Sequence, residues 1–230
     1  MSKSERSIQA DTMATVATRN LTAQRFRLDD VSWDFYEHLL EELGDRRVRV
    51  TFDRGALELT APTYRHENYG RTLGKFVIVM SEVLNIPVKD GGSTTFRRED
   101  LDRGLEPDDC FYIRNVRKIL GKDEIDLAID PPPDLAIEVD IASSSLDRMS
   151  IYAALGVPEV WRFDGHELFI HCLRSGEYEV CDTSLTFSML PVHELVKFLH
   201  ESTELDDVAL LRKVRAWVRR HVTRKRRKAK

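Results

Sequence analysis

The chain has 230 residues, of which 42% are hydrophobic and 32% charged, with a formal net charge of −4 at pH 7. This composition is typical of one globular domain with a substantial core, and it excludes a disordered or collagen-like protein. The apolar runs are far shorter than the roughly 20 residues that a membrane helix needs, and the N-terminal residues lack the apolar stretch of a secretory signal. We therefore expect a soluble, cytoplasmic protein without a membrane partner.

The charges are distributed unevenly along the chain. Residues 212–230 contain 11 Lys and Arg residues and no acid, so the first 211 residues hold 24 basic and 39 acidic side chains. A basic tail of this kind can contact a phosphate backbone or an acidic protein surface, or can simply be solvated. The three cysteines form no CxxC pair, which excludes a disulfide framework and disfavours a cysteine-based zinc site.

The first half of the chain alternates between helices and short strands. Residues 1–24 are polar and show no periodicity, so we expect a disordered N-terminal arm. Ser32 is a favourable N-cap before apolar residues at helical spacing, and Asp53-Arg54-Gly55 joins two alternating segments in the manner of a hairpin. The expected elements are a helix at 32–44, strands at 47–52 and 56–60, a long helix at 65–84, and strands at 86–89, 93–97 and 108–113.

The second half contains the strongest strand signal, residues 134–141. Ser144, with Asp147 three residues later, has a capping-box pattern that predicts a helix ending at Gly156. A strand–helix–strand unit over 134–163 indicates an α/β or mixed α+β fold with a central mixed sheet. The other expected elements are strands at 159–163, 168–172 and 177–180 and helices at 192–200 and 205–221, which divide the chain into an arm (1–24), a domain (25–200) and a C-terminal helix with basic tail (201–230).

The strand at 134–141 carries acids on one of its two faces. A period of two places aliphatic residues on one side and Asp134, Glu138 and Asp140 on the other. Burial of an unpaired carboxylate costs several kcal/mol, so these acids must meet cations, hydrogen-bond donors, a metal or a wet cleft, unless the strand is an exposed edge. Asp108 begins another β-rich run, where it can equally be a turn residue. Carboxylates from two strands, without a Cys or His ligand set, suit a hard cation such as Mg²⁺.

An ordered series of motifs resembles the bacterial putative restriction endonuclease family, within the PD-(D/E)XK nuclease superfamily. The motifs are Glu-Pro-Asp108, the strand that contains Glu138, the segment Ser-Leu-Asp-Arg-Met-Ser-Ile-Tyr152, and Gly-Val-Pro-Glu-Val-Trp161. The resemblance covers most of the expected domain and implies a restriction-endonuclease-like fold, a central mixed β-sheet flanked by α-helices. It also implies an endonuclease that hydrolyses DNA phosphodiester bonds with Mg²⁺, for which Mn²⁺ can substitute.

The resemblance assigns roles to particular residues. Asp108 and Glu138 match the two motif acids and would bind the metal, and Glu67 matches a position where the superfamily often places an extra acid. The superfamily's lysine normally lies two residues after the second acid, where this chain has Asp140. In this family the lysine lies four residues before the tyrosine, where this chain has Arg148. Arg148 can stabilise charge on a phosphate, but it stays protonated and cannot act as a base.

Two other functions are consistent with the sequence. One is a catalytically impaired nuclease-fold protein that binds nucleic acid or a protein partner without cutting. The arginine at position 148, where the family has lysine, and the basic tail at 212–230 favour this function. In that case Arg148 would be a structural ion-pair partner of Asp147 or Glu138. Alternatively, the amphipathic C-terminal helix would assemble a homodimer or larger homo-oligomer. Its apolar positions are Leu205, Val208, Leu211, Val214 and Val218.

Overall fold

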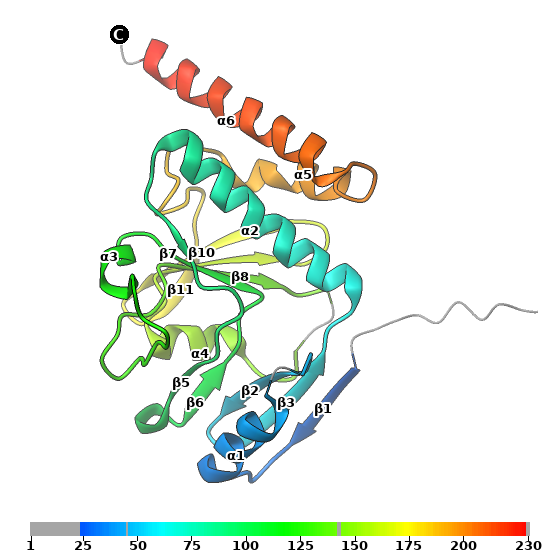
Figure 1. The fold of residues 1–230 in the computed structure, drawn as a ribbon, viewed down its shortest axis with the longest axis vertical. Coiled ribbons are helices and arrows are strands. Elements are labelled where there is room, and N and C mark those ends of the chain that lie inside the picture. The colour runs from blue at the N-terminus through cyan, green and yellow to red at the C-terminus, as the bar shows by residue number, and fades with distance from the viewer. Residues whose placement is uncertain (1–23, 45, 142–143, 229–230) are drawn as a thin grey trace, which may run out of the picture.

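The computed structural model describes residues 24–44, 46–141 and 144–228, and within them the strands form two sheets (Figure 1). The predicted N-terminal arm lies outside this range except for Gln24, which begins strand β1 (Gln24–Leu28). The mixture of strands and helices confirms the α/β class. The sequence predicts one central sheet, however. The second sheet arises because the early hairpin pairs on one side with residues 24–28 and on the other with the strands formed by residues 96–105.

The smaller sheet is antiparallel in every pair and has the strand order β1-β3-β2-β6-β5. The predicted hairpin is confirmed, and Arg54 and Gly55 form its turn with positive φ values of 49° and 87°. Helix α1 (Trp33–Leu43) packs on one face, and its predicted N-cap Ser32 accepts a hydrogen bond from the Phe35 N–H. The strands are β1 (Gln24–Leu28), β2 (Arg49–Asp53), β3 (Ala56–Ala61), β5 (Phe96–Arg98) and β6 (Arg103–Leu105).

The larger sheet is mixed and has the order β11-β10-β9-β8-β7-β4. Its β8 and β9 strands are parallel, whereas the other neighbours are antiparallel. The predicted strand at 134–141 is β8, which lies between β9 and β7, so the alternative of an exposed edge strand is wrong. The strands are β4 (Lys89–Asp90), β7 (Asp109–Tyr112), β8 (Leu135–Val139), β9 (Glu159–Phe163), β10 (Leu168–Arg174) and β11 (Glu177–Val180).

Helices cover both faces of the larger sheet (Figure 1). Helices α2 (Tyr64–Leu84) and α6 (Asp207–Lys228) pack together over one face, and α4 (Arg148–Leu155) covers the other as the crossover between β8 and β9. No helix in the described part of the chain is long and apolar enough to cross a membrane. The shorter helical segments are η1 (Glu99–Leu101), α3 (Val116–Ile119), η2 (Val192–Leu195) and α5 (Val196–Glu201).

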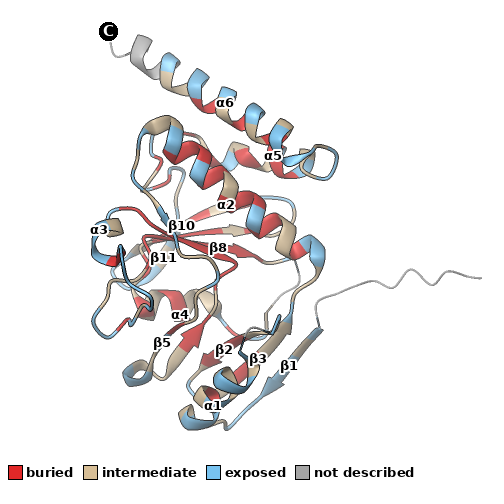
Figure 2. Ribbon diagram, viewed as in Figure 1, coloured by how far each residue is buried: buried red, intermediate tan, exposed pale blue. Residues whose placement is uncertain are grey.

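Strand β8 is buried along its whole length (Figure 2), and its side chains divide between two cores as the period-two pattern predicts. Leu135, Ile137 and Val139 of β8 belong to the core beneath α2 and α6, whereas Ala136 packs with α4. Helix α6 contributes to this same core. Much of its apolar face, which an oligomer interface would need, is therefore covered within the chain. Its buried residues are Leu210, Val214, Trp217 and Val218.

The helix predicted from Ser144 begins four residues later, at Arg148. Its N-cap is Asp147, whose side chain accepts a hydrogen bond from the Ser150 N–H. The Ser144 hydroxyl instead donates to Glu58 of β3 at 2.7 Å, and Ser145 donates to the same carboxylate through its N–H and its hydroxyl. The buried Glu58 carboxylate needs these donors, and a tertiary contact therefore overrides the local capping pattern.

Candidate functional site

Two acids from neighbouring strands meet at the junction of the sheets. Strands β7 and β8 pair with Asp109 opposite Ile137, so their register places Asp108, immediately before β7, opposite Glu138. The Asp108 N–H donates to the Ile137 carbonyl at 3.1 Å, and the Val139 N–H donates to Asp108 Oδ2 at 2.5 Å. The side chains of Asp108 and Glu138 are only 1% and 9% exposed. The fold thus brings together two carboxylates that are distant in sequence.

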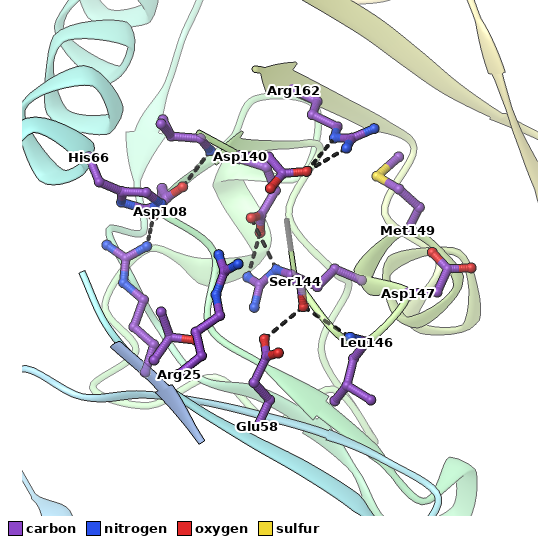
Figure 3. A pocket seen from close by; sticks show the side chains of 15 residues that line it. Arg25, Glu58, His66, Asp108, Asp140, Ser144, Leu146, Asp147, Met149 and Arg162 are labelled. Carbon is purple, nitrogen blue, oxygen red and sulfur yellow. Dashed lines mark hydrogen bonds and ion pairs between the residues drawn. The ribbon is translucent and has the colours of Figure 1, made fainter. Parts of the chain in front are cut away.

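A cavity of about 180 Å³ opens beside these acids, between β3 and the loop that leads from β8 to α4 (Figure 3). Carboxylates and guanidiniums both line it, and several of them pair with each other. Asp140, for example, forms an ion pair with Arg162, and Glu58 holds the Ser144 loop. The cavity is therefore strongly polar, with its charges nearly balanced. Its charged residues are Arg25, Arg49, Arg148, Arg162, Glu58, Asp108, Glu138, Asp140 and Asp147.

Arg49 of β2 neutralises Asp108. Its guanidinium forms an ion pair with Asp108 Oδ1, and its Nη2 lies 2.5 Å from Glu67 Oε1 on α2. His66 Nδ1 lies 3.5 Å from the same Asp108 oxygen. Burial, and then the positive charge of Arg49, lower the pKa of His66 below its usual value, so the imidazole is predominantly neutral at pH 7. Arg49 thus connects the first motif acid to Glu67, the predicted accessory acid.

Arg148 forms an ion pair with the second motif acid, Glu138. Its Nη2 and Nε lie 2.6 and 3.1 Å from the two carboxylate oxygens of Glu138, a bidentate ion pair. Its other hydrogen bonds go to the Thr51 hydroxyl at 2.5 Å and the Glu106 carbonyl at 2.6 Å. The Tyr152 hydroxyl also donates to Glu138. Burial opposes the charge of Arg148, but Glu138 outweighs it with the other partners and raises the arginine pKa, so Arg148 stays protonated.

Two glycines allow α2 to lie close to the strand that carries the first acid. A Cβ at Gly70 would be 3.1 Å from the Cβ of Asp108, and a Cβ at Gly74 would be 2.0 Å from Asp109 Oδ2. Both glycines are buried, and neither has a positive φ, so close packing rather than backbone conformation requires glycine here. The GxxxG spacing puts both on the helix face that contacts β7.

Gly74→Ala is expected to lower the free energy of unfolding by roughly 1–2 kcal/mol. Displacement of the buried Asp109 carboxylate costs about 1–3 kcal/mol. The better helix propensity of alanine offsets up to about 1 kcal/mol of this cost. Urea denaturation of the two proteins measures this difference. A variant as stable as the wild type would show that α2 does not need this close approach.

Of the predicted site residues, Asp108, Glu138 and Arg148 line the cavity together. Glu67 lies on the far side of Arg49 and lines a neighbouring cavity. Asp134, the first acid of the predicted polar face, points elsewhere: its carboxylate accepts hydrogen bonds from the Ile113 and Asn115 N–H groups at 2.7 and 3.0 Å. Its role in the structure is to fix the turn after β7.

The cavity also contains three charged residues that no motif in the sequence marks, Arg49, Glu58 and Arg25. All three lie on the strands of the smaller sheet, where polar residues alternate with the apolar residues that pack under α1. That alternation shows that the hairpin has a polar face. It does not show that this face turns toward the larger sheet, because the packing of one sheet against another has no local signature.

The donor chemistry of the two motif acids fits a hard divalent cation. Mg²⁺ commonly takes one or two protein carboxylates and completes its shell with water and substrate phosphate. Among the described residues, no group of three or more His, Cys, Asp or Glu side chains is arranged to hold a metal ion. Asp108 and Glu138 each form an ion pair with an arginine. Metal binding therefore requires Arg49 and Arg148 to shift toward another anion.

Together, the fold and the cavity define a mixed α/β protein with paired strand-borne acids and arginines at one polar site. The chain belongs to the putative restriction endonuclease family (Uma2), whose sequence model matches residues 33–205. This match confirms the family resemblance seen in the motifs.

The chain is also similar to a solved structure, a putative nuclease belonging to DUF820 from Anabaena variabilis ATCC 29413. The two share 17% sequence identity and superpose with a TM-score of 0.46, over 65% of this chain and 90% of that chain. No curated protein matches the sequence.

Proposed function

We propose that this protein is a nuclease that hydrolyses DNA phosphodiester bonds in the cavity between its two sheets, with Mg²⁺ held by Asp108 and Glu138. The observation that carries the proposal is the juxtaposition of these two acids, one immediately before β7 and one in β8, in a cavity lined by four arginines. Membership of the putative restriction endonuclease family supports the same class of activity.

The side chains of the cavity suit the charge changes of phosphodiester hydrolysis. A Mg²⁺ ion held there would polarise the phosphodiester and lower the pKa of a bound water. Arg148 donates hydrogen bonds to Thr51 and Glu106 and presents a permanent positive charge beside Glu138, where it would stabilise the negative charge that develops on the phosphoryl oxygens. The Val139 N–H orients the Asp108 carboxylate through its second oxygen.

Substrate phosphate provides the anion that would release the acids from their arginines. In the structure Arg49 and Arg148 neutralise Asp108 and Glu138. A guanidinium binds phosphate in the same bidentate manner as carboxylate, so an incoming phosphodiester can take over part of this pairing while the carboxylates turn to the metal. We therefore expect Mg²⁺ to bind more tightly when DNA is present.

Asp108→Asn is expected to reduce Mg²⁺-dependent DNA cleavage on the order of 10²–10³-fold or more, because the amide lacks the charge that holds the metal and the activated water. The measurement is cleavage of supercoiled plasmid and of duplex and single-stranded oligonucleotides in Mg²⁺, in Mn²⁺ and in EDTA. Calorimetry of Mg²⁺ binding, with and without DNA, tests the metal site directly. Glu167→Gln, at an exposed acid that does not line the cavity, is the matched control.

A nuclease-fold protein that binds DNA without cutting is the second candidate. The observation that favours it is the complete pairing of both motif acids with arginines. Salt-dependent DNA binding without cleavage in any metal would support this candidate. Cleavage by Asp108→Asn at the wild-type rate would instead place the active site elsewhere in the molecule.

A further inference from the structure

A second cavity, of about 560 Å³, lies on the other side of Arg49. It is bounded by the segment before β2 and by the first turns of α2. Its charged lining consists of four arginines, Arg46, Arg47, Arg49 and Arg71, and two acids, Glu67 and Glu106. Its aromatic residue is Tyr64, which is 86% exposed. The cavity therefore offers an exposed aromatic ring and several guanidiniums in one recess of the surface.

Two of these arginines are available for a ligand. Arg46 and Arg47 are exposed, and neither forms an ion pair with any acid in the described part of the chain. Arg71 is 75% exposed, and its nearest acid, Glu67, is 3.8 Å away. By contrast, the arginines of the first cavity at positions 49, 148 and 162 all lie in short ion pairs.

Arg49 connects the second cavity to the candidate active site. It lines both cavities, and its guanidinium bridges Asp108 in the first and Glu67 in the second. A phosphate in the second cavity that attracted Arg49 would therefore weaken its hold on Asp108. The second cavity is thus placed to hold the part of a substrate that lies next to the scissile phosphate.

We infer that this second cavity binds a single-stranded segment of DNA, with Arg46, Arg47 and Arg71 on its phosphates and a base stacked on Tyr64. The inference rests on the proposed nuclease function and specifies its substrate class. Aromatic stacking on unpaired bases, combined with a positively charged groove along the backbone, is the general mode of single-strand binding. A base within a duplex is already stacked on its neighbours and does not offer its face to Tyr64.

The charge balance of the molecule also favours a single strand. The first 211 residues have 39 acids and 24 basic residues, so an extended duplex would meet repulsion beyond the basic cavity. One flexible strand needs only a local basic surface of the size that Arg46, Arg47 and Arg71 provide.

The test is fluorescence anisotropy of the full chain with a labelled oligothymidine of about 12 nucleotides, a length within the range of single-strand site sizes. EDTA is present, so neither metal nor cleavage contributes. Arg46→Ala/Arg47→Ala is expected to weaken binding about tenfold or more. The slope of log K against log salt concentration should fall by about 1.4, or 0.7 for each lost phosphate contact. Tyr64→Ala should weaken binding at least about fivefold, and Tyr64→Phe should restore it.

Arg117→Ala/Lys118→Ala is the matched control, because it removes two adjacent, exposed basic side chains from α3 that line neither cavity. Its affinity should stay within about twofold of the wild type. The inference is overturned if the Arg46/Arg47 variant keeps wild-type affinity and salt dependence, if the α3 control loses as much affinity, or if duplex DNA binds more tightly than the single strand.

Hydrolysis of bis(4-nitrophenyl) phosphate separates this inference from the proposed function, because this small diester has no base to stack. Hydrolysis that requires Asp108 but is unchanged in the Arg46/Arg47 variant supports the proposed active site and the separate role of the second cavity. If hydrolysis requires Asp108 and the cavity variants also bind oligothymidine normally, the active site stands and the second cavity is not the strand-binding site.

Discussion

Glu138→Ala is expected to lower the free energy of unfolding by about 3–5 kcal/mol, in addition to abolishing metal-dependent cleavage. The substitution leaves the Arg148 guanidinium in a nearly buried position without its bidentate partner and removes the acceptor of the Tyr152 hydroxyl. Loss of one partner of a buried ion pair typically has this cost, because the remaining charge is desolvated and uncompensated. Urea denaturation monitored by tryptophan fluorescence measures the change.

Two control variants separate the structural and catalytic parts of this effect. Glu138→Gln still offers a carbonyl oxygen to Arg148 and Tyr152, so its stability loss should be smaller, about 1–3 kcal/mol, while the lost charge still removes cleavage. Asp140→Ala breaks the more exposed ion pair with Arg162 near the end of the same strand and should cost at most about 1 kcal/mol. Equal losses in Glu138→Ala and Asp140→Ala would show that the Glu138–Arg148 pair does not stabilise the fold.

Asp109→Asn is expected to remove a large pH dependence of stability. Asp109 follows Asp108 in the sequence, and its carboxylate lies on the face of β7 that contacts Gly74 of α2. Burial, and then the neighbouring Asp90, raise its pKa from 3.8 to about 7. Since the folded state holds this proton more tightly than the unfolded state, its contribution to stability is complete below pH 4. The contribution is lost as the pH rises through 7.

The measurement is urea denaturation of the wild type and of Asp109→Asn at pH 5 and pH 8. Over this interval the wild type should lose roughly 2–3 kcal/mol more than the variant, within the limit of 1.36 kcal/mol per pH unit for one proton. The asparagine can still accept from the Cys110 N–H and can donate to Asp90, so the variant should fold normally. Parallel pH profiles for the two proteins would show that Asp109 titrates near its ordinary pKa.

The sequence alone determined most of the individual elements, because the signals for them are local. The caps of α1, the turn of the β2–β3 hairpin and the period of two in β8 each depend on residues within four positions of one another. The family motifs are also continuous runs of sequence, and they identified the family that the sequence model confirms. For the same reason, the sequence predicts both the strand at 134–141 and the division of its side chains into an aliphatic and an acidic face.

Tertiary structure alone decided how these elements combine. The start of α4 differs from the capping pattern because Glu58, remote in sequence, binds Ser144 and Ser145. Burial of the polar face of the smaller sheet against β7 and β8 places Arg49 on Asp108. Neither contact has a local signature, because a buried carboxylate needs some cation or donor but its own sequence does not specify which one. The sequence thus identified Asp108 and Glu138 as candidate acids, whereas only the packing of the two sheets determined the arginines that neutralise them.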